Sequence, residues 1–411
     1  MLTKSSKRKD FDMRYSYQSN DSVFAKKLSE ARKAAERFAE RASVVDRNGT
    51  FPVENVSELK ARKLMSASLP NISDERQPSL RSLASMAQVL SSGCLSTGMI
   101  WAMHVQQVEV LIRQGRNEFL LHLLSKLAEE QPLIASVTTE KKKGGHLLTS
   151  HSPLFHEGGE LYIDRHAPIV TGGEYADWFL ITMKESEFSS STDVKLVLAE
   201  RSQLEFENVS EWEAMGMRGT GSIGMRIRGK IGREQMIGVA TNFKQLAVQV
   251  LIPIGHILWS ACWLGAAKGV YERLIQLIRD PRNRSRFNLQ SDLLYARIAR
   301  IRLQLDTVDI YLGEMMKRYE KNCNNGQLEQ LEEPRFNIHI NNLKIIASET
   351  LFKATDDMIE VAGLTYGFIT NDRLPLERAF RDLRSASLMY HNDRLLLANG
   401  RLNLIDNRLL P

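Results

Sequence analysis

The chain has 411 residues, of which 43% are hydrophobic and 25% charged, with a net charge of +6 and a pI near 9.1. This is an ordinary globular composition, and the length is sufficient for two or three domains. The basic residues form no face interleaved with aromatic residues, which argues against a nucleic-acid-binding protein. The longest apolar run, Leu251–Val270, contains His256 and Lys268. We therefore expect a buried helix there rather than a membrane span.

The cysteine pattern limits the cellular compartments in which the protein is expected. Cys94, Cys262 and Cys323 are widely spaced, and their odd number argues against a disulfide framework. No metal-ligand spacing links them to a histidine, so we predict no metal site. The N-terminus is polar and basic, without the apolar core of a signal peptide. These features favour a cytoplasmic protein.

The first third of the chain is predicted to be helical. Residues 1–20 are a polar tail that we expect to be mobile. Apolar residues at helical spacing predict a helix from Asp21 to the Asn48-Gly49 turn, another over Pro52–Leu64 and a long one over roughly Leu80–Arg113. We place an N-terminal helical domain at residues 21–131.

After the N-terminal helical domain, the spacing of the apolar residues changes from the helical period to the alternation that is typical of strands. Short alternating runs surround a His156–Gly159 turn, which is a hairpin signal. The predicted strands are Leu147–Phe155, Glu160–Ile163, Asp177–Met183, Val194–Leu198 and Met225–Arg228. We expect a middle, β-barrel-like domain over residues 132–240.

Helical periodicity returns at Phe243 and persists to the end of the chain. Its clearest part is an apolar seam with 4-3-4 spacing, made by Leu294, Ile298, Ile301, Leu305, Val308, Leu312, Met315 and Tyr319. Such a seam is typical of antiparallel bundle helices. We predict a C-terminal four-helix bundle over residues 241–411, and hence an α+β fold.

A glycine-rich turn separates the strand-like region from the helical one. Glu213–Ser222 reads E-A-M-G-M-R-G-T-G-S. Such a turn can present backbone N–H groups and the charge of Arg218 to an anionic or electron-rich ligand. The alternative is a tight connection at a domain boundary.

Five short motifs follow one another along the chain. They are Val137–Glu140; Ile169–Gly173 followed by Ala176–Trp178; Met215–Ser222; Arg284 with Phe287; and Pro375–Arg378 followed by Phe380–Asp382. In this order, on a helical–β–helical pattern, they resemble the acyl-CoA dehydrogenase superfamily of flavoproteins. The resemblance spans roughly residues 21–405. It implies an FAD-dependent oxidoreductase.

The resemblance assigns cofactor-binding residues. Thr138, Thr139 and Thr171 are expected in β loops, where their hydroxyls would donate hydrogen bonds to the reduced flavin ring. The alternative is that these hydroxyls satisfy their own turns. Arg284 and Phe287 would reach the FAD of a neighbouring subunit, which implies a homodimer or homotetramer. A solvated loop after Pro281 is the alternative for that pair.

A second glycine-rich loop is expected to approach the same cofactor. It contains Gly363, Thr365, Tyr366 and Gly367. Taken without the resemblance, a lone pair of glycines is a weak signal.

The sequence departs from the family pattern at the catalytic base. The family's two positions for a glutamate fall on Tyr390 and Gly255. The candidates for the base are therefore Tyr390, His391 and Asp393. Of these, His391 could act near neutral pH, whereas a solvated or core-satisfied histidine is the alternative.

The substrate anchors are also replaced. The family's Asp and Arg align with Pro253 and His256, and we count His104 and His256 as candidate substrate-binding residues. Ile169 replaces an aromatic residue that stacks on the flavin. The segment Lys141–His146 could meet a phosphate or form a surface loop.

Three functional hypotheses follow. The first is desaturation of an acyl thioester carried by CoA or an acyl carrier protein, with an electron-acceptor flavoprotein as partner. The second is a reduced-flavin-dependent monooxygenase of the same fold, served by a flavin reductase. The third is a flavin-binding subunit without its own activity.

Overall fold

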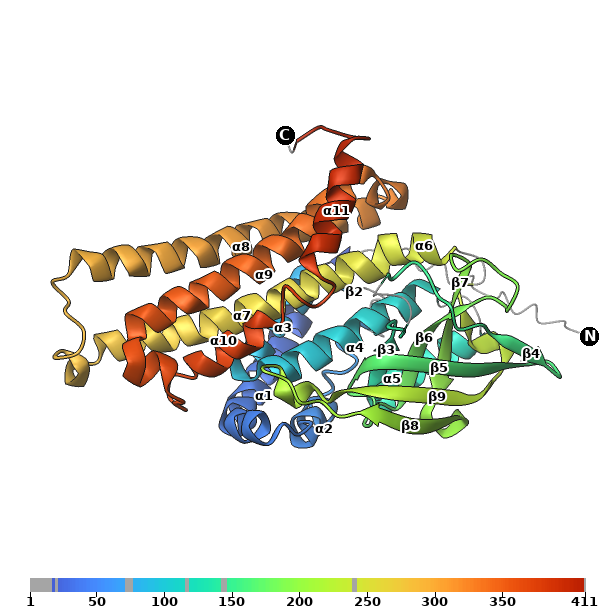
Figure 1. Cartoon of the computed structure of the whole chain (residues 1–411), viewed down its shortest axis with the longest axis horizontal. Coiled ribbons are helices and arrows are strands. Elements are labelled where there is room, and N and C mark those ends of the chain that lie inside the picture. Colours follow the sequence, from blue (N-terminus) through green and yellow to red (C-terminus); the bar gives the residue numbers. More distant parts are fainter. Residues whose placement is uncertain are drawn as a thin grey trace, which may run out of the picture.

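The computed structural model describes residues 17–18, 21–70, 77–114, 118–141, 146–238 and 242–409. The predicted tail at residues 1–20 lies outside them, apart from the short strand β1 (Tyr17–Gln18), which pairs with β2 (Gln77–Pro78). The strands β3 to β10 gather at one end of the molecule, and the long helices α7, α8 and α9 extend away from them (Figure 1).

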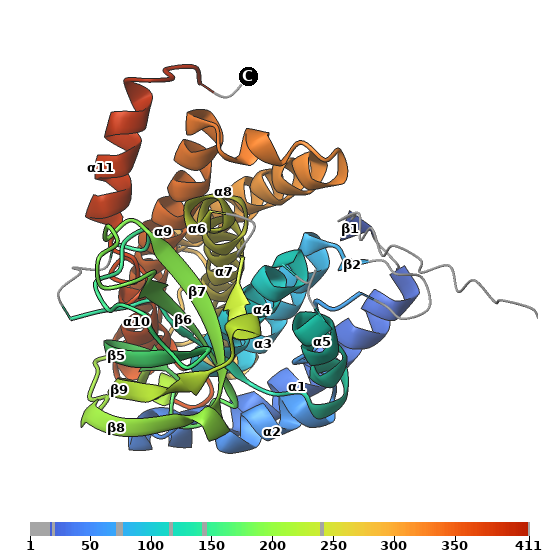
Figure 2. The same ribbon diagram turned by 90° about the vertical axis from the view of Figure 1, so that its right-hand side faces the viewer.

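Helices fill the first part of the chain, as predicted. They are α1 (Asp21–Asn48), α2 (Val53–Ala61), α3 (Leu80–Gly93), α4 (Leu95–Gln114) and α5 (Glu118–Glu130). The helix expected over Leu80–Arg113 is divided, because Cys94 has an extended backbone. Gly93 lies so close to α1 that a Cβ there would be 2.2 Å from the Ala35 carbonyl oxygen. Figure 2 shows α3, α4 and α5 beside the strands.

Two four-stranded sheets follow, with strand orders β10-β7-β6-β3 and β4-β5-β9-β8. The strands are β3 (Ile134–Val137), β4 (Phe155–Glu157), β5 (Glu160–Thr171), β6 (Trp178–Lys184), β7 (Val194–Glu200), β8 (Leu204–Ser210), β9 (Ser222–Ile231) and β10 (Met236–Ile237). All pairs are antiparallel except β3 with β6. The predicted hairpin turn is confirmed, with left-handed Gly158 and Gly159. The strand before it is shorter than predicted, because residues 147–154 of the expected strand Leu147–Phe155 form turns and loop with one isolated bridge at Pro153. In the described residues each sheet has two free edges, so the expected barrel-like closure is not found.

The last part is helical: α6 (Phe243–Leu246), a π-helical turn (Ala247–Leu251), α7 (Ile252–Arg279), α8 (Asp292–Asn324), α9 (Pro334–Gly363), α10 (Leu376–Arg384) and α11 (Asn392–Asn403). The predicted seam of α8 is buried from Ile301 to Tyr319, whereas Leu294 and Ile298 are only half-buried. The segment Phe243–Arg279 is apolar enough to cross a membrane, but 89% of its most apolar stretch is buried inside the structure.

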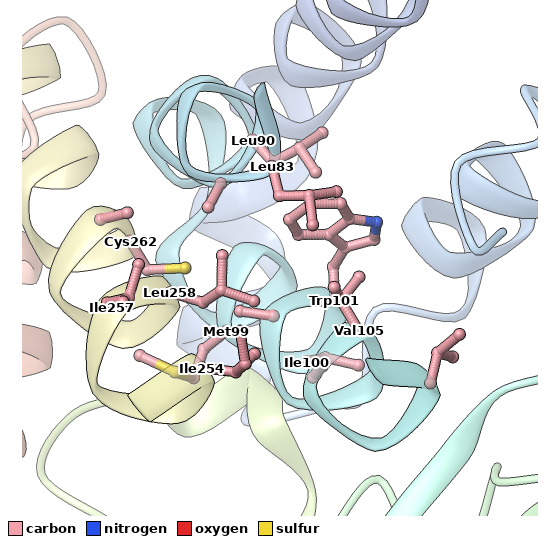
Figure 3. Close-up of a cluster of buried hydrophobic side chains, with 14 of the residues drawn as sticks. Leu83, Leu90, Met99, Ile100, Trp101, Val105, Ile254, Ile257, Leu258 and Cys262 are labelled. Atoms are coloured by element: carbon pink, nitrogen blue, oxygen red, sulfur yellow. The ribbon is translucent and has the colours of Figure 1, made fainter. Parts of the chain in front are cut away.

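One continuous core joins all these parts. Helices α3, α4 and α7 pack through Leu83, Leu90, Met99, Leu258 and Cys262 (Figure 3). The helices that were predicted to form separate N-terminal and C-terminal domains therefore share a core, and the predicted domain boundaries remain a prediction. Cys94, Cys262 and Cys323 are buried and free. The cytoplasmic location also remains a prediction.

Candidate functional site

A cavity of about 730 Å³ lies where the strand loops meet α4, α7 and the connection from α10 to α11. Its wall includes the loop Thr138–Lys141, the end of β5 at Thr171, and the glycine-rich turn at Gly216 and Met217. The helical side of the wall is formed by Met99, Ile100, Met103, Gln106, Leu251, Ile252, His256, Trp259, Arg381, Arg384, Ser385, Leu388, Met389, Tyr390, His391 and Arg394. The cavity thus joins elements from all three parts of the chain.

A buried ion pair fixes the Thr138–Glu140 loop. Arg165 of β5 is fully buried and lies 3.1 Å from the Glu140 carboxylate. Arg165 also donates to the Thr139 carbonyl at 2.9 Å, while Glu140 accepts from the His151 amide and the Ser152 hydroxyl. Burial lowers the pKa of Arg165 to about 10, which still leaves the guanidinium charged at neutral pH. Arg165 was not among the predicted site residues, although its place at an inward position of an alternating strand was a usable signal.

Three hydroxyl groups beside the cavity form a chain of hydrogen bonds, in which each group donates to the next one. Thr220 donates to the Met217 carbonyl at 2.9 Å, so its single proton is used there. Ser222 must then donate to Thr220 at 2.8 Å, and Thr171 to Ser222 at 2.9 Å. Thr139 likewise donates to the Ile169 carbonyl. The hydroxyl oxygens of Thr139 and Thr171 can therefore only accept a hydrogen bond from a ligand. The sequence-based prediction was that these hydroxyls donate hydrogen bonds to the flavin ring.

Thr138, Thr139 and Thr171 line the same cavity, as expected if they meet one ligand. The hydroxyl oxygens of Thr139 and Thr171 suit the N–H groups of an isoalloxazine ring. The residues present thus fit a flavin, although the direction of their hydrogen bonds is the reverse of the expected one. Of the segment Lys141–His146, Lys141 also lines the cavity and is exposed, while residues 142–145 lie outside the described part of the chain.

The glycine-rich turn is a junction between three elements. Gly216 approaches α10 so closely that a Cβ would lie 2.0 Å from the Arg381 carbonyl oxygen. Met217 adopts a left-handed φ of 55°, and its amide donates to Asp382. Arg218 donates to the carbonyls of Asp46, Arg47 and Ala214. The charge of Arg218 therefore caps the C-terminal end of α1 and is not presented to a ligand.

His256 lies on the cavity wall, next to two aromatic rings. Its ring centroid is 5.9 Å from those of Trp259 and Tyr390. Its Nδ1 is 3.2 Å from the Ile340 carbonyl. Burial and the neighbouring charge of Lys344 lower the pKa of His256 to about 3. The imidazole is therefore neutral in the working pH range.

Tyr390 is held in place by a buried lysine. Its φ of 46° is unusual for a residue with a side chain. Lys344 of α9 donates to the Tyr390 carbonyl at 3.3 Å and to Asn392 Oδ1 at 2.7 Å. Burial lowers the pKa of Lys344 to about 7, and burial raises the pKa of the Tyr390 phenol. Lys344 was not among the predicted site residues, because it lies between the apolar residues Leu343 and Ile345 of α9.

His391 and Asp393 differ in their relation to the cavity. His391 lines the wall with its side chain 46% exposed, and its Nδ1 accepts from the Asp393 amide at 3.2 Å as the cap of α11. Asp393 is not part of the wall, and its side chain is 83% exposed.

His104 lies away from the cavity wall. It is fully buried, with Nε2 2.8 Å from the Met65 carbonyl and Nδ1 accepting from the Ile134 amide at 3.1 Å. Burial lowers its pKa to about 4. Both ring nitrogens are thus used in joining α4 to β3 and to the segment after α2. We therefore leave His104 out of the substrate-binding set.

The remaining cofactor candidates gather elsewhere. Arg284 and Phe287 follow α7, at the bundle end away from the strands (Figure 1), and Gly363, Thr365 and Tyr366 lie at the end of α9. The Tyr366 hydroxyl is 3.4 Å from Asn283 Oδ1, so the two groups adjoin. None of the five lines the cavity. Within one chain, the predicted flavin contacts are therefore divided between two places.

Comparisons with known proteins agree on the fold. Residues 247–390 match the family model of the acyl-CoA dehydrogenase C-terminal domain. Cyclohexane-1-carbonyl-CoA dehydrogenase of Geobacter metallireducens is 21% identical over 354 residues, which cover 85% of this chain and 89% of that protein.

Two solved structures illustrate the range of similar proteins. The FMN-bound dibenzothiophene monooxygenase of Paenibacillus sp. A11-2, also solved with FMN and indole, has a TM-score of 0.80 at 17% identity and covers 94% of this chain and 98% of its own. Butyryl-CoA dehydrogenase of Megasphaera elsdenii has a TM-score of 0.79 at 14% identity and covers 94% and 99%. These matches confirm the resemblance to the acyl-CoA dehydrogenase superfamily of flavoproteins: the chain has its fold, and residues 247–390 match its C-terminal domain.

Proposed function

We propose that this protein is a flavin-dependent oxidoreductase whose cavity suits a reduced-flavin-dependent monooxygenase better than an acyl-thioester dehydrogenase. The observation that carries the proposal is the state of the acids at the cavity. Among the described residues that line it, Glu140 is the sole carboxylate. That carboxylate is already engaged by Arg165, Ser152 and the His151 amide. A dehydrogenase needs a free base to remove the α-proton of its substrate.

His391 does not replace the missing base in this geometry. Because Nδ1 accepts from the Asp393 amide, the neutral ring carries its proton on Nε2. The nitrogen that remains for a ligand is then a donor. A donor at this place suits the stabilisation of negative charge on oxygen, and it cannot take up a proton without a change of tautomer.

The chain supplies the binding surface for a flavin. Thr138, Thr139 and Thr171 would hold the ring, while the Arg165–Glu140 pair keeps their loop in place. When bound, a reduced flavin supplies the two electrons with which dioxygen is cleaved, one oxygen atom entering the substrate and the other leaving as water.

We propose FAD as the cofactor and a homodimer or homotetramer as the assembly. A guanidinium such as that of Arg284 suits the pyrophosphate of FAD, which FMN lacks. Since Arg284 does not line the cavity of its own chain, it would serve the cavity of a neighbouring subunit. FMN is the alternative, and a separate flavin reductase would be the partner.

The test compares the two reactions on one preparation. We expect the protein to bind reduced flavin more tightly than oxidised flavin under anaerobic conditions. We also expect that butyryl-CoA, isobutyryl-CoA and cyclohexane-1-carbonyl-CoA leave the bound oxidised flavin yellow. Rapid anaerobic bleaching of the flavin by any of these thioesters would overturn the proposal.

The dehydrogenase is the second candidate, because the curated relative with 85% coverage of this chain carries that activity in its name. In that case Tyr390 or His391 would have to act as the base, since Asp393 is outside the cavity wall. If His391 is that base, His391→Ala is expected to lower turnover at least about tenfold, and unchanged turnover would remove it from the site.

A further inference from the structure

The inner end of the cavity, between α4 and α7, combines apolar side chains with aromatic rings. Met99, Ile100 and Met103 form the α4 side, and Figure 3 shows Met99 and Ile100 where α4 packs against α7. The rings of Trp259 and Tyr390 both lie next to His256, each with its centroid 5.9 Å from that of the imidazole. Flat rings and thioether side chains favour a planar aromatic ligand.

Two polar atoms in this apolar surrounding lack a partner among the described residues: Nε1 of Trp259, which is buried, and Nε2 of His256. The Ile340 carbonyl can only accept, so Nδ1 of His256 carries the proton and donates to it. The imidazole is 2% exposed, and that exposure is to the cavity it lines. Within the described part of the chain, Nε2 has no hydrogen-bond partner. It therefore offers a lone pair at a site from which most water is excluded.

The neighbours of His256 keep this lone pair available. Burial and the charge of Lys344 both disfavour protonation of the ring. Lys344 is itself buried and bonded to the Tyr390 carbonyl and to Asn392. The same lysine thus positions Tyr390 and keeps His256 an acceptor.

We propose that His256 selects the substrate: the inner cavity binds a planar aromatic molecule that carries an N–H or O–H group and donates it to Nε2 of His256. An acyl thioester would leave Nε2 of His256 without a donor, because its carbonyl and sulfur offer only lone pairs. A buried acceptor left without a donor costs free energy, and this penalty discriminates against ligands without an N–H or O–H.

The inference rests on the proposed function only in taking this cavity as the substrate site. Indole and benzofuran test it, because they share a shape and differ in the N–H group. Calorimetric titration of the full-length protein is expected to give an indole affinity at least about fivefold above that of benzofuran. Equal affinities would overturn the inference without reference to any variant.

Two substitutions test whether His256 causes the preference for indole over benzofuran. His256→Leu removes the acceptor, and the ratio of the two affinities should fall to about one. His256→Gln supplies an amide oxygen, which is expected to restore part of the preference for indole. The matched control is His122→Leu on the exposed face of α5, which should keep the wild-type ratio. A preference for indole that survives in His256→Leu contradicts the role of His256.

Flavin binding is measured separately on the same preparations. If indole discrimination is found but reduced flavin does not bind, the inference stands and the proposed function fails. If reduced flavin binds and discrimination is absent, the proposed function stands and the inference fails.

Discussion

Two buried histidines, His104 on α4 and His256 on α7, have similar surroundings and different hydrogen bonding. Both are almost fully buried, and burial lowers the pKa of each, to about 4 and about 3. His104 uses both nitrogens on backbone groups, at Met65 and Ile134. His256 uses one, at Ile340, and no partner is found for its other nitrogen among the described residues, although the residue lines the cavity.

This comparison shows that neither burial nor a shifted pKa distinguishes a structural histidine from a ligand-binding one. A count of hydrogen-bond partners does, because a buried polar atom without a partner is costly unless a ligand or water satisfies it. Four measurements test the distinction between structural and ligand-binding groups, beginning with the largest expected change in the free energy of unfolding.

His104→Leu is expected to lower the free energy of unfolding by about 3 kcal/mol at pH 7. The Met65 carbonyl and the Ile134 amide would both lose their partner inside the core. Denaturant unfolding of the full chain measures this loss. The exposed His122→Leu serves as the control, and an equal midpoint for both variants would contradict the role assigned to His104.

At acidic pH, the free energies of unfolding of the wild type and of His104→Leu should become more similar. The folded pKa of His104, about 4, lies below the unfolded value near 6.5, so its contribution is complete above pH 6.5 and is lost as the pH falls towards 4. The difference is expected to shrink by about 1.4 kcal/mol per pH unit in this window. Unfolding at several pH values measures it, and groups such as Asp382 cancel because both proteins contain them. A constant difference would mean that His104 is not held neutral.

His256→Leu is expected to lower the free energy of unfolding by about 1 kcal/mol or less, as measured by denaturant unfolding. Only one hydrogen bond is lost, and the Ile340 carbonyl lies inside α9, where it also accepts along the helix. A loss as large as that of His104→Leu would remove the contrast between the two histidines.

Arg284→Gln should change the free energy of unfolding by less than about 0.5 kcal/mol, because this exposed side chain has no partner in the described residues. If a neighbouring subunit's FAD meets Arg284, the same variant lowers FAD affinity about tenfold and FMN affinity less. Arg282→Gln, in the same loop but paired with Asp280 at 2.6 Å, is the control. Identical FAD affinities in both variants would remove Arg284 from the cofactor site.

The glycine-rich turn shows how far sequence reasoning reaches at a site. The conformational freedom of its glycines could be predicted, because glycine content is a local property. Its place in the fold was predicted wrongly, because the turn joins strands β8 and β9 and does not separate the strand-like region from the helical one. The role of Arg218 could not be predicted. Its guanidinium donates to Asp46 and Arg47, which precede it by about 170 residues, and no local pattern indicates such a pairing.

The sequence alone determined the kind and order of the elements, since apolar periodicity is a property of neighbouring residues. Motifs in a fixed order also indicated the threonines that line the cavity, Thr138, Thr139 and Thr171. Tertiary structure decided what each polar group does. Lys344 meets Tyr390 and Asn392 from another helix, Arg165 meets Glu140 across the strand loops, and only the folded chain distinguishes His104 from His256. The reason is physical: a polar group's role depends on whether its partners are present when water is excluded, and those partners come from distant parts of the chain.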